Sequence, residues 1–454
     1  MNSITRISFA LVVLLLAATS QAQDTWALTL GPKQDFPHRL FGFNTNLMAA
    51  TAFHGINYSD RRFSTAVSEL KPNVLRFPGG TIANNYRWRQ DSFDLPAEDK
   101  TGWAAKRVSQ FRKSGRKYDR AGFISLCQQF DIEPIWVLNV YDESPQSVLE
   151  LLAELKKAGV KLHAIELANE PYWDPRSFNN VWKYIEVARP VAQAIRRAEP
   201  EIQIGACFGP LGKKFGYESK WNQVLAKQKW YDAVVYHEYF GGQGIAVEKG
   251  EKLPVEQLVN PSEFISTPAE YFAKLLPGNP VWMTEWNIGR EGLNEWKNTG
   301  AELQFLASTY CDLVEHRDVF QLACLHQIYE QGFGTFHWNP NKKEIVKLPS
   351  YQLHLLLAKA TDGATHVRRI RNLPDSTQGF AAANDDETRL FLVNSTNKAQ
   401  RLSLPAAIKR ATLLEVPPKS RPADFKETEL DQSTNASATF VLPAHTICLI
   451  VLWK

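Results

Sequence analysis

The chain has 454 residues, of which 44% are hydrophobic and 22% are charged, as in globular proteins with a sizeable core. Its formal net charge of +4 at pH 7 is too mild to indicate a nucleic-acid partner. Beyond the N-terminus no stretch stays apolar over the roughly 20 residues that a membrane-spanning helix needs. We therefore expect neither a nucleic-acid partner nor a membrane span.

Residues 1–22 have the pattern of a secretory signal. Arg6 supplies the positive start, residues 9–18 form a short apolar run, and Ser20-Gln21-Ala22 fits a small-x-small cleavage site. We expect the mature chain to start at Gln23 and to be secreted or periplasmic.

Five cysteines are scattered over the chain, an odd number without metal-ligand spacing. Their neighbours are apolar, which favours buried free thiols over a disulfide framework. They are Cys127, Cys207, Cys311, Cys324 and Cys448.

Short apolar runs alternate with longer amphipathic segments from residue 38 to residue 360, which is typical of a parallel sheet covered by helices. Eight such units predict an α/β fold of the (β/α)8 TIM-barrel type. An open doubly wound sheet is the alternative, but no glycine-rich phosphate turn follows the first strand. The predicted strands are 40–46, 74–77, 134–140, 164–168, 202–208, 233–237, 281–286 and 321–328.

Residues 361–454 change to short β-type runs separated by turn residues, which predicts a small C-terminal antiparallel β-sandwich domain. The predicted strands are 379–383, 389–393, 411–415, 438–441 and 447–452. A further strand within residues 23–37 precedes the barrel and can join the same sandwich.

Two glutamates stand at the ends of predicted strands. Glu170 follows the fourth strand within Ala168-Asn169-Glu170-Pro171, and Glu285 closes the seventh within Thr284-Glu285-Trp286-Asn287. The carboxyl ends of barrel strands meet at one face, where active sites of such barrels lie. Paired carboxylates cleave glycosidic bonds, because one protonates the leaving oxygen while the other attacks or supports the anomeric carbon. This chemistry needs no cofactor, and the histidines show no paired metal-ligand spacing.

The motifs resemble those of the clan A glycoside hydrolases. They run in strand order as Arg76-Phe77-Pro78-Gly79-Gly80, Asn169-Glu170, His237-Glu238-Tyr239 and Glu285-Trp286-Asn287. The pattern is most similar to the family 51 α-L-arabinofuranosidases, with the family 39 xylosidases and family 79 glucuronidases as relatives. The resemblance covers the whole barrel.

The resemblance implies a retaining double displacement, with Glu170 as general acid/base and Glu285 as nucleophile. It also implies that Asn169 binds the sugar hydroxyl next to the anomeric carbon. Tyr239 and Arg76 then hold the nucleophile, with His237 beside them. Further substrate contacts are expected from Asn46, Trp88 and Trp286. A structural ion pair for Arg76 and a core position for His237 remain alternatives, and Glu166 is the carboxylate that competes with this assignment because alternation turns it toward the face of Glu170.

The chain departs from the family 51 pattern where the sugar is held. Asn44-Thr45-Asn46 replaces an acidic contact, Thr81 replaces an asparagine, and Ile288-Gly289 replaces a tryptophan. The reaction type is thus better supported than the sugar. The expected function is a secreted retaining hydrolase of plant or matrix polysaccharide, arabinofuranosidase-like. A β-glucuronidase, a β-xylosidase, a transglycosylase and a non-catalytic carbohydrate-binding protein are the alternatives.

Two long connections, at residues 79–118 and 238–267, are expected to wall the cleft. Trp88 and Trp103 in the first connection can stack on sugar rings or fill the small core of the loop. A basic cluster in the same connection can be a solvated helix face or an acidic-sugar subsite. It comprises Lys106, Arg107, Arg112, Lys113, Arg116, Lys117 and Arg120.

Overall fold

The structure, a computed structural model, describes residues 25–95, 103–212, 216–241, 255–289, 296–431 and 438–453. The expected secretory signal at residues 1–22 lies outside these residues. No helix in the part of the chain that is described is both long and apolar enough to cross a membrane. The five cysteines are all buried free thiols, as the sequence indicated.

Eight parallel strands close into a barrel in which each strand pairs with its neighbours in sequence and the last pairs with the first. All eight strands predicted from the sequence are present, and the predicted barrel is confirmed. In chain order they are β4 (Gly42–Asn44), β5 (Val74–Phe77), β8 (Glu133–Leu138), β9 (Ala164–Leu167), β10 (Gln203–Cys207), β11 (Ala233–Phe240), β12 (Val281–Ile288) and β13 (Phe320–Leu325).

The barrel strands are buried on both sides, because one face fills the barrel interior and the other packs on helices. All eight residues of β12 are buried. The polar side chains among them, Thr284, Glu285 and Asn287, are therefore expected to be paired inside the protein.

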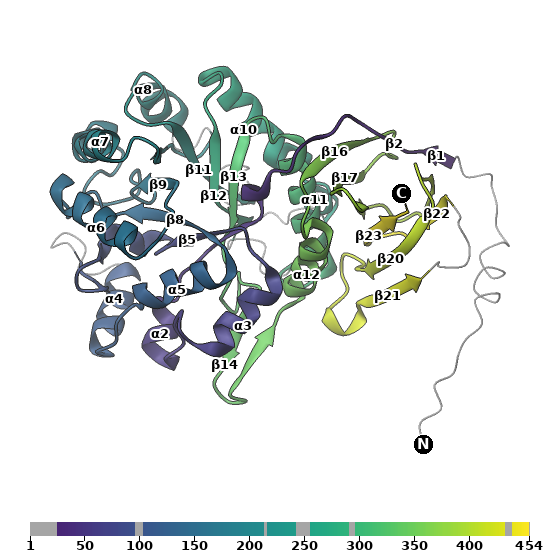
Figure 1. The fold of residues 1–454 in the computed structure, drawn as a ribbon, viewed down its shortest axis with the longest axis horizontal. Coiled ribbons are helices and arrows are strands. Elements are labelled where there is room, and N and C mark those ends of the chain that lie inside the picture. The colour runs from purple at the N-terminus through teal and green to yellow at the C-terminus, as the bar shows by residue number, and fades with distance from the viewer. Residues whose placement is uncertain are drawn as a thin grey trace.

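Helices surround the barrel (Figure 1). Their starts follow local capping rules. In α6, for example, Ser144 accepts a hydrogen bond from the Ser147 backbone N–H and Pro145 occupies the first turn. The covering helices are α3 (Arg61–Leu70), α5 (Arg120–Phe130), α6 (Pro145–Lys157), α7 (Val181–Ala198), α8 (Gln223–Leu225), α10 (Ser262–Leu275), α11 (Gly300–Glu315) and α12 (Pro349–Thr361).

The C-terminal region forms two sheets, and α11 and α12 lie between them and the barrel strands (Figure 1). The larger sheet contains β2 (Thr29–Leu30), β3 (Gln34–Asp35), β16 (His366–Arg371), β17 (Thr377–Ala383), β18 (Thr388–Asn394), β20 (Ile408–Glu415), β21 (Lys426–Asp431) and β23 (Thr446–Leu452). The smaller sheet contains β1 (Thr25–Ala27), β19 (Gln400–Ser403) and β22 (Thr439–Leu442). Apolar side chains such as Leu28, Leu402 and Ile450 form a core of their own within this region.

The start of the described chain belongs to this sandwich rather than to the barrel. Strand β1 runs parallel to β19, while β2 and β3 pair antiparallel with β16. Figure 1 shows β1 at the sandwich, away from the barrel. The N-terminal strands thus tie the two ends of the chain into one domain.

Several further elements stand in the connections that leave the carboxyl ends of the strands. They are α2 (Met48–His54), η2 (Thr81–Asn85), β6 (Tyr86–Arg87), β7 (Ser92–Phe93), α4 (Trp103–Lys113), α9 (Val255–Val259), β14 (Phe336–Asn339) and β15 (Glu344–Lys347). The hairpin of β14 and β15 projects from the lower edge of the barrel in Figure 1 and was not predicted.

Candidate active site

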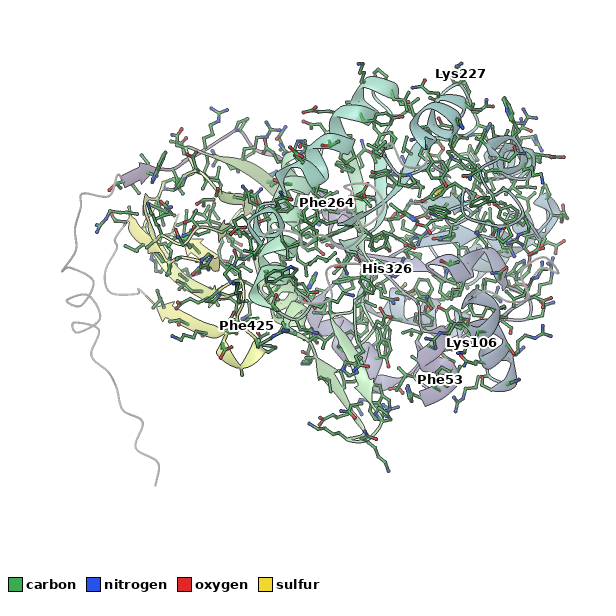
Figure 2. All side chains as sticks on the ribbon, turned by 180° about the vertical axis from the view of Figure 1, so that it is seen from behind. Phe53, Lys106, Lys227, Phe264, His326 and Phe425 are labelled. Atoms are coloured by element: carbon green, nitrogen blue, oxygen red, sulfur yellow. The ribbon has the colours of Figure 1, made fainter. Side chains whose placement is uncertain are left out.

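Polar side chains from six of the eight strands and their following loops gather at the carboxyl edge of the barrel. They are Asn44, Arg76, Glu166, Asn169, Glu170, His237, Tyr239, Glu285 and His326. Figure 2 labels His326, which lies within the barrel half of the molecule. The structure therefore brings both predicted carboxylates to one place.

Glu285 is 4% exposed and accepts three hydrogen bonds. Arg76 Nη1 donates to Oε1 at 2.7 Å, Asn44 Nδ2 donates to Oε1 at 2.9 Å, and Tyr239 Oη donates to Oε2 at 2.7 Å. Burial by itself raises the pKa of Glu285, but the positive charges of His237, His326 and Arg76 and the Tyr239 hydrogen bond hold that pKa well below its usual range. Glu285 is thus held as a carboxylate.

Glu285 lies inside β12 rather than at its end, where the sequence had placed it. Strands β11 and β12 continue to pair beyond the expected boundary, with Tyr239 opposite Asn287 and Phe240 opposite Ile288. This extended pairing fixes the backbone on both sides of Glu285.

Arg76 is completely buried and joins two carboxylates. It forms a forked pair with Glu166, at 2.7 Å between Nη2 and Oε2, while its Nη1 reaches Glu285 and its Nη2 also bonds Asn169 Oδ1 at 2.8 Å. Burial lowers the pKa of Arg76, but the charges of Glu166 and Glu285 outweigh it and hold this pKa above the ordinary arginine value. Arg76 therefore supplies a fixed positive charge beside Glu285.

Glu166, the carboxylate that competed with Glu170 in the sequence, has no solvent exposure and is fully engaged by Arg76. Glu238, which neighbours His237, accepts a hydrogen bond from Tyr236, the residue on the same side of β11. Neither carboxylate is placed to act on a substrate.

Glu170 follows the end of β9 by three residues and adopts a positive φ of 44°, as Ala168 does at 67°. Asn84 holds this unusual backbone from both sides. Its Oδ1 accepts from the Asn169 N–H at 2.7 Å, and its Nδ2 donates to the Asn169 carbonyl at 2.7 Å and to Asp174 at 2.9 Å. Asn84 was not predicted as part of the site, and it fixes the backbone of Asn169 directly before Glu170.

The Glu170 side chain is 20% exposed and contacts neutral or titratable donors. His237 Nδ1 lies 3.2 Å and Tyr172 Oη lies 3.4 Å from its Oε1, and His237 Nε2 lies 3.1 Å from Thr284 Oγ1. Ligating atoms of Glu170, His237 and Glu285 all lie within 4.8 Å of one another. The two carboxyl groups therefore face each other across a very short gap.

The same three residues offer the geometry of a metal site. However, the Arg76 guanidinium already balances the charge of Glu285 at 2.7 Å, and His237 is bonded to both Glu170 and Thr284. A dication would meet this fixed positive charge at short range. The donor set fits proton transfer between two carboxyl groups better than metal binding.

Asn169 and Asn46 line the approach to the carboxylates. Asn169 Nδ2 is buried and has no hydrogen-bond partner within the described part of the chain, so a donor is left for a ligand. Gly79 and Gly80 have positive φ, and a Cβ on Gly79 would lie 2.0 Å from Asn44 Oδ1. A Cβ on Gly80 would lie 3.4 Å from Asn46 Nδ2 and 4.0 Å from Glu285 Oε1, so the double glycine leaves this approach open.

Two predicted contacts are not brought to the carboxylates. Trp88 is buried, donates to Ser147 Oγ at 3.1 Å, and lies under the guanidinium groups of Arg89 and Arg120. Trp286 is fully buried and packs edge-on against Tyr310 of α11 at 5.0 Å, because side chains alternate along β12 and Glu285 takes the inner face. Both tryptophans serve packing in this structure.

The Trp103 side chain lies outside the described residues. In the basic cluster, Arg112 pairs with Asp94 at 2.8 Å, Arg120 with Glu154 at 3.1 Å, and Lys117 with the Gln90 carbonyl at 2.6 Å. These bonds within the protein favour the solvated-surface interpretation of the cluster.

His326 and Asn44 were not predicted to contact a carboxylate. His326 Nδ1 lies 3.6 Å from Glu285 Oε2 and 3.0 Å from Asn44 Nδ2. Both residues end or follow an apolar barrel strand, and a polar residue at that point is the signal that could have indicated them.

No protein-family model matches the sequence of this chain. One characterised relative, an intracellular exo-α-(1→5)-L-arabinofuranosidase of Streptomyces lividans, is 22% identical over 201 residues; the match covers 38% of this chain and 29% of that protein.

Solved structures are similar over almost the whole chain. An α-L-arabinofuranosidase of Thermotoga maritima has a TM-score of 0.70 at 15% identity, covering 95% of this chain and 100% of that one. The family 51 enzyme of Bifidobacterium longum has a TM-score of 0.71 at 17% identity, covering 94% and 99%. A family 44 xyloglucanase of Paenibacillus polymyxa has a TM-score of 0.61 at 11% identity, covering 95% and 100%. The resemblance to the family 51 α-L-arabinofuranosidases is thus confirmed at the level of the fold, which is a (β/α)8 TIM barrel followed by a β-domain.

Proposed function

We propose that this protein is a secreted glycoside hydrolase that cleaves polysaccharide by a retaining double displacement. The sugar that we propose it releases is the α-L-arabinofuranosyl unit. The observation that carries the proposal is the facing pair of Glu170 and Glu285, of which Glu285 is paired with a buried arginine and Glu170 is partly open to solvent. The similar arabinofuranosidases support the choice of sugar.

The settings of the two carboxyl groups assign their roles. Glu285 is buried beside Arg76, so it stays ionised and acts as the nucleophile. Glu170 contacts His237 and Tyr172, and it is partly exposed. It can therefore hold a proton, release it and take one back, as a general acid/base must.

In the first step Glu285 attacks the anomeric carbon, the bond to the leaving oxygen breaks, and Glu170 gives its proton to that oxygen. In the second step water attacks the same carbon, Glu170 takes a proton from the water, and the ester bond to Glu285 breaks. Asn169 Nδ2 is placed to bond the sugar hydroxyl beside the reacting carbon during both steps.

The short gap favours retention over inversion. Inverting enzymes separate their carboxyl groups by about 6.5–9.5 Å to admit a water, whereas retaining enzymes keep them about 5–5.5 Å apart. Carboxylate oxygens of Glu170 and Glu285 lie within 4.8 Å of each other, which fits the shorter separation of a retaining pair better than the longer one of an inverting pair. Residues 1–22 support secretion, because they have the order of a signal sequence.

The test is hydrolysis of aryl glycosides by the mature chain from Gln23. We expect activity on the α-L-arabinofuranoside; β-D-xyloside and β-D-glucuronide serve as alternatives. Glu285→Ala should lower kcat at least about a thousandfold on every substrate. Glu170→Ala should slow the hydrolysis of glycosides with poor leaving groups most. Azide should restore the activity of this variant on a glycoside with a good leaving group. Glu199→Ala, a surface partner of Lys156, is the control.

Proton NMR of the first sugar released decides the stereochemistry, and N-terminal sequencing of exported protein decides the cleavage site. Release of the opposite anomer would exclude the double displacement. Unchanged hydrolysis by Glu285→Ala would remove the proposed nucleophile. Activity on the xyloside or glucuronide alone would keep the mechanism and replace the sugar.

A further inference from the structure

Three aromatic side chains that are at least partly exposed follow Glu170 closely in the chain. We call Trp173, Phe178 and Trp182 the aromatic shelf. Phe178 is 53% exposed and Trp182 is 63% exposed, the two largest values among the large apolar side chains that are described. Trp173 is partly exposed, and its ring lies 6.0 Å from that of Phe178 at an angle of 33°. Grouped exposed aromatic rings mark binding surfaces more often than chance.

The shelf begins at the proposed acid/base. The Trp173 N–H donates to the Glu170 carbonyl at 2.8 Å, and Tyr172 Oη lies 3.4 Å from the Glu170 carboxyl. The Trp173 ring also packs edge-on against Tyr217 at 5.9 Å. The first ring of the shelf is therefore fixed close to the group that would protonate the leaving oxygen.

The rest of the shelf is held by the backbone rather than left as a loose loop. Ser177 Oγ donates to the Pro171 carbonyl at 2.6 Å, and the Asn179 N–H donates to the Tyr172 carbonyl at 3.3 Å. Asn180 caps α7 by accepting from the Trp182 N–H at 3.2 Å. A platform held this way binds with little ordering cost.

We propose that the aromatic shelf binds the sugar units on the leaving-group side of the scissile bond. The inference rests on the proposed function. Because Glu170 must touch the glycosidic oxygen, the departing part of the chain has to lie along the segment that carries Glu170. Sugar rings present apolar C–H faces that pack on aromatic rings, while their hydroxyls stay in water.

Three rings in succession indicate more than one bound sugar unit. A single unit beside Glu170 needs Trp173 alone, whereas Phe178 and Trp182 lie further along the chain and are progressively more exposed. The shelf therefore recognises an oligosaccharide or polymer rather than a small aglycone. It makes the enzyme prefer extended substrates at the leaving side.

The experiment compares Trp182→Ala and Phe178→Ala with the parent protein on two substrates. One is para-nitrophenyl α-L-arabinofuranoside, whose aglycone is too short to reach the shelf, and the other is arabinopentaose. For each variant we expect kcat/KM on the pentaose to fall about tenfold, mostly through KM, with less than about a twofold change on the aryl glycoside. Trp453→Ala, a 45% exposed tryptophan on the sandwich, is the matched control and should change neither.

Equal losses on both substrates, or none on either, would overturn the shelf as a leaving-side subsite while leaving the hydrolase assignment intact. If the parent protein hydrolyses neither, the proposed function fails and the shelf is tested by affinity electrophoresis in gels of arabinan, arabinoxylan and xyloglucan. Retardation that Trp182→Ala abolishes would support carbohydrate binding. No retardation in any gel, or a change only in self-association by sedimentation, would overturn it.

Discussion

The ends of β9 and β12 place two glutamates at one site in opposite ways. Glu285 sits inside β12, is almost fully buried, and accepts from Arg76, Asn44 and Tyr239. Glu170 stands beyond its strand on a backbone with positive φ, is 20% exposed, and contacts His237 and Tyr172. One carboxyl is thus fixed among buried polar partners, and the other is open to solvent.

The difference shows that burial alone does not decide the protonation of a carboxyl here, because nearby positive charge can outweigh it. Glu302 in the first turn of α11 is also buried, at 6% exposure, and accepts the Asn298 N–H. Burial raises the pKa of Glu302 to about 7, against the lowered pKa of Glu285. The buried guanidinium of Arg76 is thus one of the charges that keep the proposed nucleophile ionised despite its burial.

Replacing Arg76 should erase this difference and have the largest effect. Arg76→Met leaves Glu166 and Glu285 buried without their cation, which costs about 3–5 kcal/mol of unfolding free energy. The pKa of Glu285 should rise, so the acidic limb of kcat/KM moves to higher pH, and activity should fall at least about a hundredfold. Urea unfolding and pH–rate profiles measure the two effects.

Arg112→Met is the control for Arg76, because Arg112 pairs with Asp94 at the surface and should cost at most about 1 kcal/mol. Arg76→Lys keeps the positive charge but loses the forked ion pair with Glu166. It should have a higher free energy of unfolding than Arg76→Met. An unshifted acidic limb in Arg76→Lys and Arg76→Met alike would show that Arg76 does not set the ionisation of Glu285.

Asn84 tests the other side of the comparison, because it positions Glu170 without touching Glu285. Asn84→Ala removes three hydrogen bonds and should cost about 2 kcal/mol. A misplaced Glu170 matters only when the leaving group needs a proton. We expect kcat/KM for a poor aryl leaving group to fall about tenfold or more than that for a dinitrophenyl leaving group.

Asn394 offers a matched control in the sandwich. It is buried, donates to the Lys398 and Pro443 carbonyls, and accepts from the Thr396 N–H. Asn394→Ala should cost a similar free energy but leave the ratio of the two rates unchanged. An unchanged ratio in Asn84→Ala would make Asn84 a purely structural residue.

The barrel could be predicted because each strand is a short apolar run between polar, helix-forming segments. Three sandwich strands escaped prediction for the opposite reason. Strands β16, β19 and β21 are rich in charged or polar residues, as in Lys426–Asp431, and β21 is an edge strand with one face in water. A strand with few buried side chains lacks the pattern of apolar residues from which a strand is predicted.

At the site, the carboxylate pair and the contacts of Arg76 and Tyr239 with Glu285 could be predicted, but the support by Asn84 could not. Asn84 bonds residues 85 positions away, and no local pattern encodes such a contact. Trp286 could have been excluded, because neighbours on a strand face opposite ways and Glu285 faces inward. Trp88 could not, since the loop that carries it folds back onto α6 through Ser147.

Glu302 should give the smallest effect, because burial raises its pKa although the charge of Lys297 opposes the shift. Its pKa of about 7 lies above the unfolded value near 4.3, so between these pH values the folded state holds a proton that the unfolded state has lost. The free energy of unfolding therefore falls as pH rises through this window.

Glu302→Gln stays neutral and should gain about 1–3 kcal/mol over the parent between pH 5 and pH 8. Urea unfolding at both pH values measures the gain as a difference from the parent, which cancels the contribution of Asp312, whose pKa burial also raises to about 7. Glu315→Gln, on the exposed side of the same helix, should gain nothing, and parallel curves for Glu302→Gln and the parent would show that burial does not raise the pKa of Glu302.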